Sequence, residues 1–530
     1  METSGSLSVY NKVVAKKWLL IGSVLLGGIL RLVWLDRLPA GFNPDEASFG
    51  YNAYSLLKTG SDEWGKPWYR LWGENLLSFG DDRYPLYTFL TVPSVAIFGL
   101  NEFATRLPNA IIGTLAILAI YGLAKVWFKG EKISLLSAWL LSISPWHVSL
   151  SRGAFETNSL TLFIPLALYF WERKKYLSSS LVLALNFYSY IAARFLTVIT
   201  WFFLTPRKIK PIILFCILVL PAVIGMMFFG SRRAKDVGIY SPTDEWKAVS
   251  ERQFNAQVRG MPKLVSRVFD NKIIYTGTAF VNNYLSFFSP QFLFTNGAGE
   301  ANYGMIPGTG LLYYWEIIPL AIFVFLKRDR RIIIALLLAV IPAALSKGIG
   351  YPANRVAAMI PFLYIAVAVG LSQTSKRIVI VLMFVSLAFF VQNYVYQSPV
   401  ITSEGMNFGW RDLMTRVTPI ANRFPEVRFS RSLSEPHIYV AFYQKIDPAV
   451  YQSYSKQWAS FVDKGYKFLD QVDGYYLGNY RFGDLKYLEP VEKDTLYIGR
   501  PDNFPELKTN YIEVFYPSGK KAIIVAEKKK

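Results

Sequence analysis

Residues 84–100, YPLYTFLTVPSVAIFGL, decide how this chain is threaded. The run is apolar, but it is only 17 residues long and contains Pro93. Because a membrane-spanning helix needs about 20 mostly apolar residues, the length favours a helix that lies at a membrane surface or re-enters it. Whether this run crosses fixes the side on which every later loop lies.

Other apolar runs occur before and after this one. They predict about eleven membrane-spanning helices. The segments are residues 18–35, 106–128, 133–148, 157–171, 176–204, 209–229, 311–326, 332–345, 356–371 and 378–395. Residues 176–204 are long enough for two short spans, with a break near residues 189–194.

The basic residues support the interpretation that residues 84–100 do not cross. In that case the amino terminus lies on the same side as the loops at residues 125–132, 173–175, 207–210, 327–331 and 376–377. These segments hold 18 basic and four acidic residues, and basic loops mark the cytoplasmic side. We therefore expect a cytoplasmic amino terminus. The first span ends without the small residues of a signal-peptide cleavage site, which predicts a retained anchor.

The composition excludes several classes of protein. Of the 530 residues, 52% are apolar and only 18% are charged, whereas soluble proteins carry about 25% charge. A soluble multidomain enzyme and a disordered chain are both excluded. Of the net charge of +20, +14 lies in the basic segments, so the charge records topology and we expect no nucleic-acid partner. One cysteine and two histidines exclude an intrachain disulfide and a multi-histidine metal site.

The predicted spans divide the chain into two domains. Residues 1–395 form an all-α polytopic membrane domain, with outer segments at residues 36–105, 149–156, 230–310 and 346–355. Residues 396–530 are expected to form a soluble extracytoplasmic α/β domain. Its patterns predict helices at residues 410–424 and 434–446, a strand at 426–433, and a hairpin of residues 511–515 and 522–526.

The first outer segment contains Gly41-Phe-Asn-Pro-Asp-Glu-Ala47. Asp45 and Glu46 begin a segment, residues 47–57, that fits an amphipathic helix along the membrane. Asp45 is then either an ordinary helix cap or a carboxylate held at the membrane surface as a general base.

Arginines gather at the same outer level. Asp82 and Arg83 stand at the start of the run that does not cross, and Arg106 follows its end. Arg106 either snorkels at a helix end, as arginines often do, or holds a phosphate through two hydrogen bonds.

Further ionisable residues lie at the outer ends of later spans. Arg152 and Glu156 are four residues apart, so a helical start would place both on one face, as an ion pair or as part of a site. His147 is either a hydrogen-bonded core residue or a contributor to the site. Polar side chains that interrupt apolar runs suggest function because they are costly in a membrane; these are Tyr190, Arg194 and Arg355.

One class of substrate explains acids and arginines at a single outer face: a sugar on a lipid phosphate. The arginines would bind the phosphate leaving group. A carboxylate would deprotonate the acceptor hydroxyl or stabilise an oxocarbenium-like centre. Because the lipid chain stays in the bilayer, the site must lie at the membrane surface.

These motifs together resemble the GT-C superfamily of polyprenyl-phosphate-sugar-dependent glycosyltransferases, in the branch of the protein O-mannosyltransferases and the lipid A aminoarabinose transferase. The resemblance covers about residues 30–371 and rests on motif order and spacing. The motifs are Asn43-Pro-Asp-Glu-Ala47, Arg83-Tyr-Pro-Leu-Tyr87, Phe98-Gly99, Arg106-Leu-Pro108, Ser144-Pro-Trp146, Ser151-Arg152, Phe288-Ser-Pro-Gln-Phe-Leu-Phe294, Pro307-Gly-Thr-Gly-Leu-Leu-Tyr313 and the stretch from Pro342 to Arg355. Phe442-Tyr-Gln-Lys-Ile-Asp-Pro448 is similar to bacterial members more loosely.

The resemblance implies an inverting transfer from a polyprenyl-phosphate-linked sugar to a hydroxyl of a protein, lipid or glycan acceptor. The place would be the outer face of a prokaryotic cell membrane. The implied catalytic residues are Asp45 as the base, its partner Glu46, and Glu156. The implied phosphate-binding residues are Arg83, Arg106, Arg152, Arg194 and Arg355. Asp82, Tyr87, His147 and Tyr190 are candidates for lining the substrate.

Two departures from the family pattern concern Arg83 and Glu156. Arg83 stands before Tyr-Pro where many bacterial members have Lys before Pro-Pro, and Glu156 stands where many members have Asp. The branch requires no metal, but an optional divalent ion at Asp45 and Glu156 stays open, with Glu46 and Asp82 as further oxygen donors.

A transporter or flippase of a lipid-linked or anionic substrate is the alternative, because transporters also carry ionisable residues in the membrane. They usually place these residues near the midplane, in broken helices related by repeats. Here they gather at one face and no repeat is detectable. A surface-binding protein that acts through residues 396–530 would leave the many spans unexplained. The sugar, the acceptor class and the role of residues 396–530 stay open.

Overall fold

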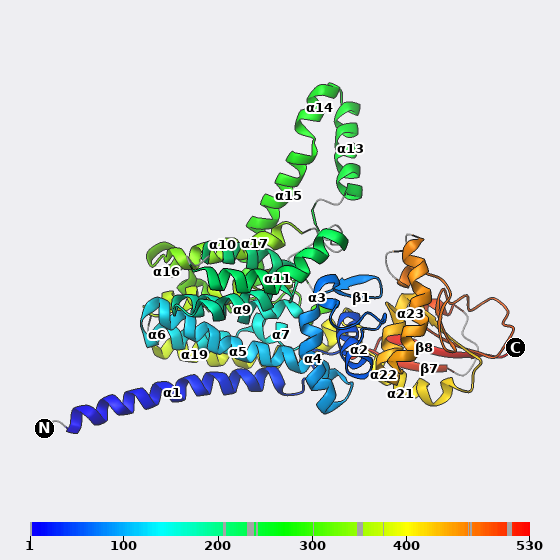
Figure 1. The fold of residues 1–530 in the computed structure, drawn as a ribbon, viewed down its shortest axis with the longest axis horizontal. Coiled ribbons are helices and arrows are strands. Elements are labelled where there is room, and N and C mark those ends of the chain that lie inside the picture. Colours follow the sequence, from blue (N-terminus) through cyan, green and yellow to red (C-terminus); the bar gives the residue numbers. More distant parts are fainter. Residues whose placement is uncertain are drawn as a thin grey trace.

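The computed structural model describes residues 3–204, 208–229, 238–239, 242–299, 301–346, 353–374, 376–464, 466, 469–505 and 511–530. It consists of a helical bundle, a region with a mixed sheet at the carboxy-terminal end, and an arm of helices that projects sideways from the bundle (Figure 1). The first outer segment lies between the bundle and the sheet.

Each apolar run that was predicted to span forms helix. The bundle contains α1 (Thr3–Leu32), α5 (Glu102–Phe128), α6 (Glu131–Ser142), α7 (Pro145–Leu150), α8 (Ser159–Glu172), α9 (Tyr176–Phe187), α10 (Ile191–Leu204), α11 (Ile209–Phe229), α16 (Ile317–Leu326), α17 (Arg330–Ala344), α18 (Met359–Leu371) and α19 (Lys376–Gln392). The predicted break near residues 189–194 falls between α9 and α10. Residues 133–148 differ from the prediction, because Pro145 begins a separate helix.

Three helical stretches of the described chain are long and apolar enough to cross a membrane: Glu102–Phe128, Ile209–Phe228 and Arg377–Thr402. Apart from α1, which has 30 residues, the other helices of the bundle are shorter, so the number of eleven spans stays a prediction. The outward faces of the bundle are apolar; Leu25, Phe228 and Phe389 are 61%, 78% and 71% exposed. Such a surface fits a lipid environment better than water.

The basic loops meet at one end of the bundle. Arg331 donates a hydrogen bond to the carbonyl of Trp127 (3.2 Å), and the indole of Trp127 donates to Glu172 (3.1 Å). The ammonium group of Lys132 contacts the carbonyl of Ser372. These contacts join loops that are distant in sequence, as the charge pattern predicted.

Helix α4 (Pro85–Phe98) is formed by the apolar run of residues 84–100, which was predicted not to cross the membrane. Just before it, the carbonyl of Phe79 accepts a hydrogen bond from the amide of Leu469 (3.2 Å). Just after it, Glu102 accepts one from the hydroxyl of Tyr443 (2.7 Å). Both ends of α4 therefore lie beside the carboxy-terminal region, which agrees with the prediction that this run does not cross.

The carboxy-terminal region contains a six-stranded sheet in the order β4-β5-β3-β6-β8-β7. Strand β3 is parallel to β5 and β6, and the other pairs are antiparallel. The strands are β3 (Glu426–Ser430), β4 (Tyr475–Leu477), β5 (Tyr480–Gly483), β6 (Thr495–Gly499), β7 (Tyr511–Phe515) and β8 (Lys521–Lys528); the helices are α21 (Trp410–Ala421), α22 (Pro436–Gln444) and α23 (Pro448–Asp463). The predicted helices, first strand and hairpin are all present, with shifted ends.

The predicted domain boundary at residue 396 falls inside a helical stretch. Helix α19 continues through Asn393–Gln397 and α20 (Ser398–Thr402). The sheet-bearing region therefore begins near Trp410, where α21 starts.

Candidate active site

The site is built on the first turn of α2 (Pro44–Thr59). Asn43 caps this helix: its side chain accepts from the amide of Glu46 (2.9 Å), and Glu46 in return accepts from the amide of Asn43 (3.2 Å). This reciprocal pair is a capping box, and Pro44 fits the first helical position. Because Asn43 is the cap, Asp45 is not needed in that role.

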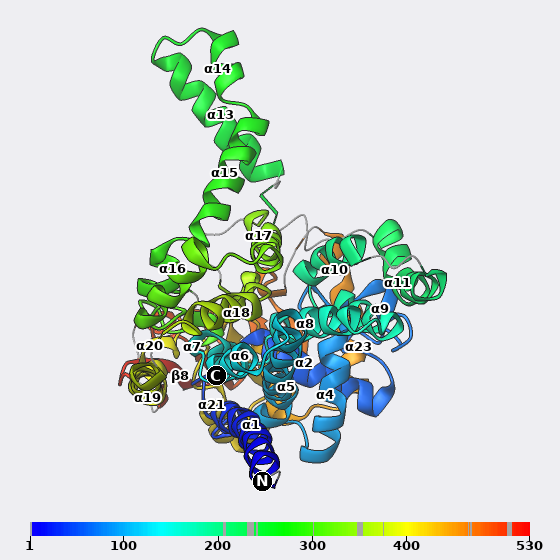
Figure 2. The ribbon, with the colours of Figure 1, turned by 90° about the vertical axis from the view of Figure 1, so that its left-hand side faces the viewer.

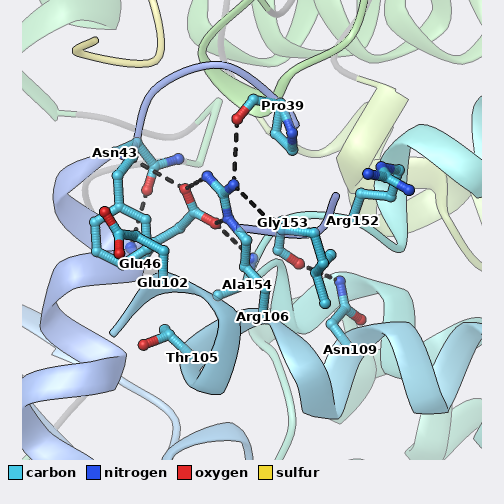
Figure 3. A network of polar contacts seen from close by, with 12 residues as sticks. Pro39, Asn43, Glu46, Glu102, Thr105, Arg106, Asn109, Arg152, Gly153 and Ala154 are labelled. Carbon is cyan, nitrogen blue, oxygen red and sulfur yellow. Dashed lines mark hydrogen bonds and ion pairs between the residues drawn. The ribbon is translucent and has the colours of Figure 1, made fainter. Parts of the chain in front are cut away.

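Glu46 and Arg106 form an ion pair with no solvent-exposed surface on either side chain (Figure 3). Arg106 Nε and Nη2 donate to the two oxygens of Glu46 at 2.8 and 2.9 Å. The backbone amide of Ala154 donates to the same carboxylate at 2.9 Å. Glu46 therefore joins the start of α2, the start of α5 and residues 151–156.

The remaining donors of Arg106 also have protein partners. Nη1 donates to the carbonyls of Leu35 and Pro39, each at 3.2 Å, and Nη2 donates to the carbonyl of Gly41 at 2.5 Å. A guanidinium has five N–H groups, so none is left for a phosphate in this arrangement. This differs from the expected role of Arg106: it holds the chain at residues 35–46 in place.

Arg152 has a similar environment. Its Nη1 contacts the carbonyl of Leu30, and its Nη2 donates to the carbonyls of Val33 (2.6 Å) and Leu38 (3.3 Å). The guanidinium also lies 5.4 Å from the ring centre of Tyr394. Arg152 therefore holds the carboxyl end of α1 against the helical turn Asn393–Gln397 that follows α19.

His147 and Tyr87 are hydrogen-bonded parts of the core. His147 Nδ1 lies 2.8 Å from Arg31 Nη2, and its Nε2 lies 3.0 Å from the hydroxyl of Thr161. Tyr87 donates to the carbonyl of Thr105 at 2.9 Å. For His147 the structure supports the core interpretation. Tyr87 also lies beside the site: its ring centre is 4.9 Å from that of Phe49, and Glu46, Arg106 and Glu156 act on it electrostatically.

Asp45 and Glu156 line a cavity of about 20 Å³. Its other lining residues are Phe49, Ala154, Phe155, Thr157, Tyr190, Tyr303 and Asn354. Arg83 Nη2 contacts Asp45 Oδ1. The structure thus brings together Asp45, Glu156, Tyr190 and Arg83. A cavity of this size holds a water molecule, and a sugar ring would require the lining side chains to move.

Two more of the predicted arginines, Arg194 and Arg355, each lie close in the chain to a residue that lines this cavity. Arg194 follows Tyr190 by one helical turn, donates to Asn75 (2.9 Å) and lies 4.3 Å from the ring centre of Tyr84. Asp82, opposite Leu77 in the β1–β2 hairpin (Leu76–Ser78 and Asp81–Arg83), acts electrostatically on Arg194. Arg355 is next to the lining residue Asn354 in the chain and donates to the hydroxyl of Ser346 at 2.8 Å.

The acids do not fit the optional divalent ion. Both oxygens of Glu46 are engaged by Arg106 and by backbone amides, and Asp45 contacts Arg83. Among the described residues, no group of three or more His, Cys, Asp or Glu side chains is placed to hold a metal ion. Magnesium and calcium need about six oxygen ligands, so we derive no step through a metal.

Glu435 is a residue that the sequence did not point to. It precedes α22, is only 5% exposed, and Arg83 and Asp45 both act on it electrostatically. Burial raises the pKa of this carboxyl well above its usual range. One turn later, Tyr439 donates to the carbonyl of Phe42 (2.6 Å), which fixes α22 against the start of α2. No spacing in the sequence links Glu435 to Asp45.

Comparisons with known proteins agree with the motifs. Residues 82–229 match the family model described as dolichyl-phosphate-mannose-protein mannosyltransferase. An uncharacterized protein of Aquifex aeolicus is 30% identical over 128 residues, which is 24% of this chain and 24% of that protein. The chain therefore aligns with about a quarter of the length of this relative.

Solved structures show a more distant similarity. ArnT from Cupriavidus metallidurans bound to undecaprenyl phosphate is 12% identical, with 96% of this chain and 98% of that chain covered and a TM-score of 0.49. The Archaeoglobus fulgidus oligosaccharyltransferase in complex with Zn and sulfate is 14% identical, with 81% and 61% covered and a TM-score of 0.41. Scores below 0.5 carry no further conclusion.

The matched segment, residues 82–229, includes α4 and the cavity-lining residues 154–157 and 190, which directly precede α8 and α10. The resemblance to the GT-C glycosyltransferases, which the motifs predicted, is thus confirmed through the mannosyltransferase family model over this segment.

Proposed function

We propose that this protein is a membrane glycosyltransferase. It transfers a sugar, with inversion, from a polyprenyl-phosphate donor to an acceptor hydroxyl at the outer face of a prokaryotic cell membrane. One observation carries the proposal: Asp45 and Glu156 line one cavity beside Arg83, and this cavity lies away from the basic loops of the bundle. The family match supports the same reaction class.

In the proposed reaction, Asp45 takes the proton of the acceptor hydroxyl. The acceptor oxygen then bonds to the anomeric carbon while the bond from that carbon to the phosphate oxygen breaks. The lipid phosphate leaves as an anion and needs no proton. Arg83 contacts Asp45, and Arg194 and Arg355 lie close in the chain to residues that line the cavity; these three arginines would stabilise the charge on the leaving group. Glu156 and Tyr190 would orient the sugar.

Arg106, Glu46 and Arg152 act as positioning residues in this proposal. Their hydrogen bonds fix residues 35–46 and residues 151–156 relative to α5. A general base contributes only when it lies within hydrogen-bond reach of the proton that it removes. The buried network therefore supports Asp45 without contacting the substrate.

The carboxy-terminal region would face the acceptor. Glu435 approaches Asp45 and Arg83 from the side of α22, opposite the bundle. An acceptor that reaches Asp45 from outside the membrane would pass this region. The chemical class of the acceptor is not part of the proposal.

The test is sugar transfer in liposomes loaded with a radiolabelled polyprenyl-phosphate sugar. Asp45→Asn should slow transfer by about 10²- to 10⁴-fold, the usual contribution of a general base. Asp412→Asn is the matched control, because Asp412 is an exposed carboxylate that pairs with Arg416 one turn away. Full activity of Asp45→Asn would eliminate Asp45 as the base. Movement of labelled lipid between leaflets without transfer would favour a flippase.

A further inference from the structure

An arm of three helices projects from the bundle: α13 (Pro242–Val258), α14 (Lys263–Phe269) and α15 (Lys272–Ser286). Figures 1 and 2 show it extending sideways, at a steep angle to α1 and α5. At its base, Asn283 donates to the carbonyls of Ala344 (3.3 Å) and Ser346 (3.2 Å). Ala344 ends α17, which begins at the basic loop of residues 327–331. The arm therefore leaves the bundle at the end opposite the basic loops.

The contacts between the helices of the arm are polar. The side-chain amide of Gln253 donates to the carbonyl of Asp270 (2.5 Å), and that of Gln257 donates to the hydroxyl of Ser266 (3.1 Å). The guanidinium of Arg252 lies 5.7 Å from the ring centre of Tyr275. Polar groups thus hold the helices of the arm together from within.

Most of the large apolar side chains of the arm are exposed, although Val249 is buried. Leu264 and Ile273 are 77% and 85% exposed. The other large apolar residues that are at least half exposed are Phe254, Val258, Val268, Phe269, Val281 and Leu285. A soluble protein would place such residues between the helices and polar residues outside. Large apolar side chains exposed in this number mark a contact with a membrane or a partner.

The charge of the arm favours a membrane over a protein partner. The arm, residues 242–286, contains six basic and four acidic residues, and five of the basic residues but only one of the acids fall within residues 252–272. Arg259, Lys263 and Arg267 lie among the exposed apolar residues of the tip and are themselves exposed. Helices that lie in a membrane interface combine an apolar face with basic residues that attract anionic lipids.

We propose that the arm lies in the outer interface of the membrane. Its exposed apolar residues enter the boundary between head groups and acyl chains, and Arg259, Lys263 and Arg267 bind the phosphates of anionic lipids. The sideways direction of the arm places it along the membrane plane if α1 and α5 cross the membrane. The inference does not depend on glycosyl transfer. It bears on the site because the chain returns from the arm to Tyr303 at the cavity.

The test uses the full-length protein in nanodiscs, with Cys216→Ser to remove the exposed native thiol. A bimane fluorophore is attached to Leu264→Cys or Ile273→Cys, and to Ser518→Cys in the exposed turn between β7 and β8 as the control. Lipids spin-labelled near the head group should quench the arm positions at least about twofold more than the control position, because interfacial helices insert at this depth. Quenching equal to that of Ser518→Cys would overturn the proposal.

The role of the basic residues is tested separately. Quenching at Leu264→Cys should be stronger in nanodiscs that contain phosphatidylglycerol than in phosphatidylcholine alone. The triple variant Arg259→Gln, Lys263→Gln, Arg267→Gln should lose this difference while its melting temperature stays that of the parent. If the triple variant keeps the difference in quenching between the two lipid compositions, the three basic residues do not bind lipid phosphates. If Leu264→Cys chains form disulfides with each other and show no lipid quenching, a second copy of the chain covers the arm and the proposal is overturned.

Discussion

Asp45 and Glu46 are neighbours in the chain and each pairs with an arginine, but the two pairs differ in their surroundings. The side chains of Glu46 and Arg106 are both 0% exposed, whereas those of Asp45 and Arg83 are 28% and 4% exposed. Glu46 also accepts hydrogen bonds from two backbone amides, and Asp45 lines a cavity.

The difference shows how one short motif can serve structure and chemistry at once. A helical turn points consecutive side chains in directions about 100° apart, so one acid can enter the core while its neighbour stays accessible. The buried pair is fully satisfied, so we expect it to determine stability. We expect the accessible pair to determine activity. The following predictions test this division between the two pairs.

The largest effect is expected from Arg106→Ala. Removing one partner of a buried ion pair leaves the other charge uncompensated, which typically destabilises a protein by about 3–5 kcal/mol. Glu46 would lose the two hydrogen bonds from Arg106, and three backbone carbonyls would lose theirs at the same time. Thermal unfolding in nanodiscs should therefore show a large loss of stability, and transfer activity should fall because the site is no longer held together.

A double-mutant cycle of Glu46→Gln and Arg106→Met checks the origin of this loss. The double variant should be more stable than the sum of the single changes predicts, because neither buried charge is left alone. Additive effects would mean that the pair does not act as a unit, and the division between the two pairs would then be wrong.

The second prediction concerns Arg83→Ala. A hydrogen bond to a charged group contributes about 1.5–3 kcal/mol, so the KM for the lipid donor should rise by about 10- to 100-fold. The melting temperature should change much less than in Arg106→Ala, because Asp45 is partly exposed to water. Donor-dependent transfer rates measure the first effect. An unchanged donor KM with a raised acceptor KM would place Arg83 on the acceptor side instead.

Glu63 extends the comparison to a buried carboxylate without an arginine. It is buried in the first outer segment and accepts from Ser78 (2.6 Å) and Asn52 (2.9 Å). Burial raises the pKa of Glu63 from 4.5 to about 8, and burial likewise raises the pKa of the neighbouring Asp62 to about 6. The folded protein therefore keeps protons that the unfolded chain has already released at neutral pH.

Stability should consequently fall as the pH rises. The stabilisation from protonated Glu63 is fully present below pH 4.5 and is lost as the pH rises through about 8. The slope from this group is at most about 1.4 kcal/mol per pH unit. Glu63→Gln keeps the hydrogen bonds to Asn52 and Ser78, because the Ser78 hydroxyl can donate or accept. This variant should flatten the profile of melting temperature against pH. An equally steep profile in Glu63→Gln would show that another group causes the slope.

The sequence predicted those features of the fold that depend on local composition. Apolar runs gave the helices of the bundle, and the basic loops indicated which helix ends meet. The gap between α9 and α10 followed from polar residues that interrupt an apolar run. Local patterns were sufficient here because a helix satisfies its backbone hydrogen bonds within one segment.

Part of the site could not be predicted, because it depends on contacts between distant segments. Three acceptors of Arg106 are backbone carbonyls at residues 35, 39 and 41, and a carbonyl has no signature in the sequence. The approach of Glu435 to Asp45 depends on how α22 packs against α2. The sequence predicted the arm only as an outer loop, because its short helices contain no long apolar run.

The smallest effect is expected from Arg411→Ala, which tests how the carboxy-terminal region is held. Arg411 donates to Glu102 (2.8 Å), but its side chain is 48% exposed and Tyr443 donates to the same carboxylate. Exposed ion pairs contribute about 0.2–1 kcal/mol, and Glu102 would keep one partner, so the melting temperature should fall only slightly and transfer should persist. Arg411→Lys should restore part of the loss. If Arg411→Ala instead destabilises the protein as much as Arg106→Ala, then the position of an arginine between the two regions, and not its burial, determines what it contributes.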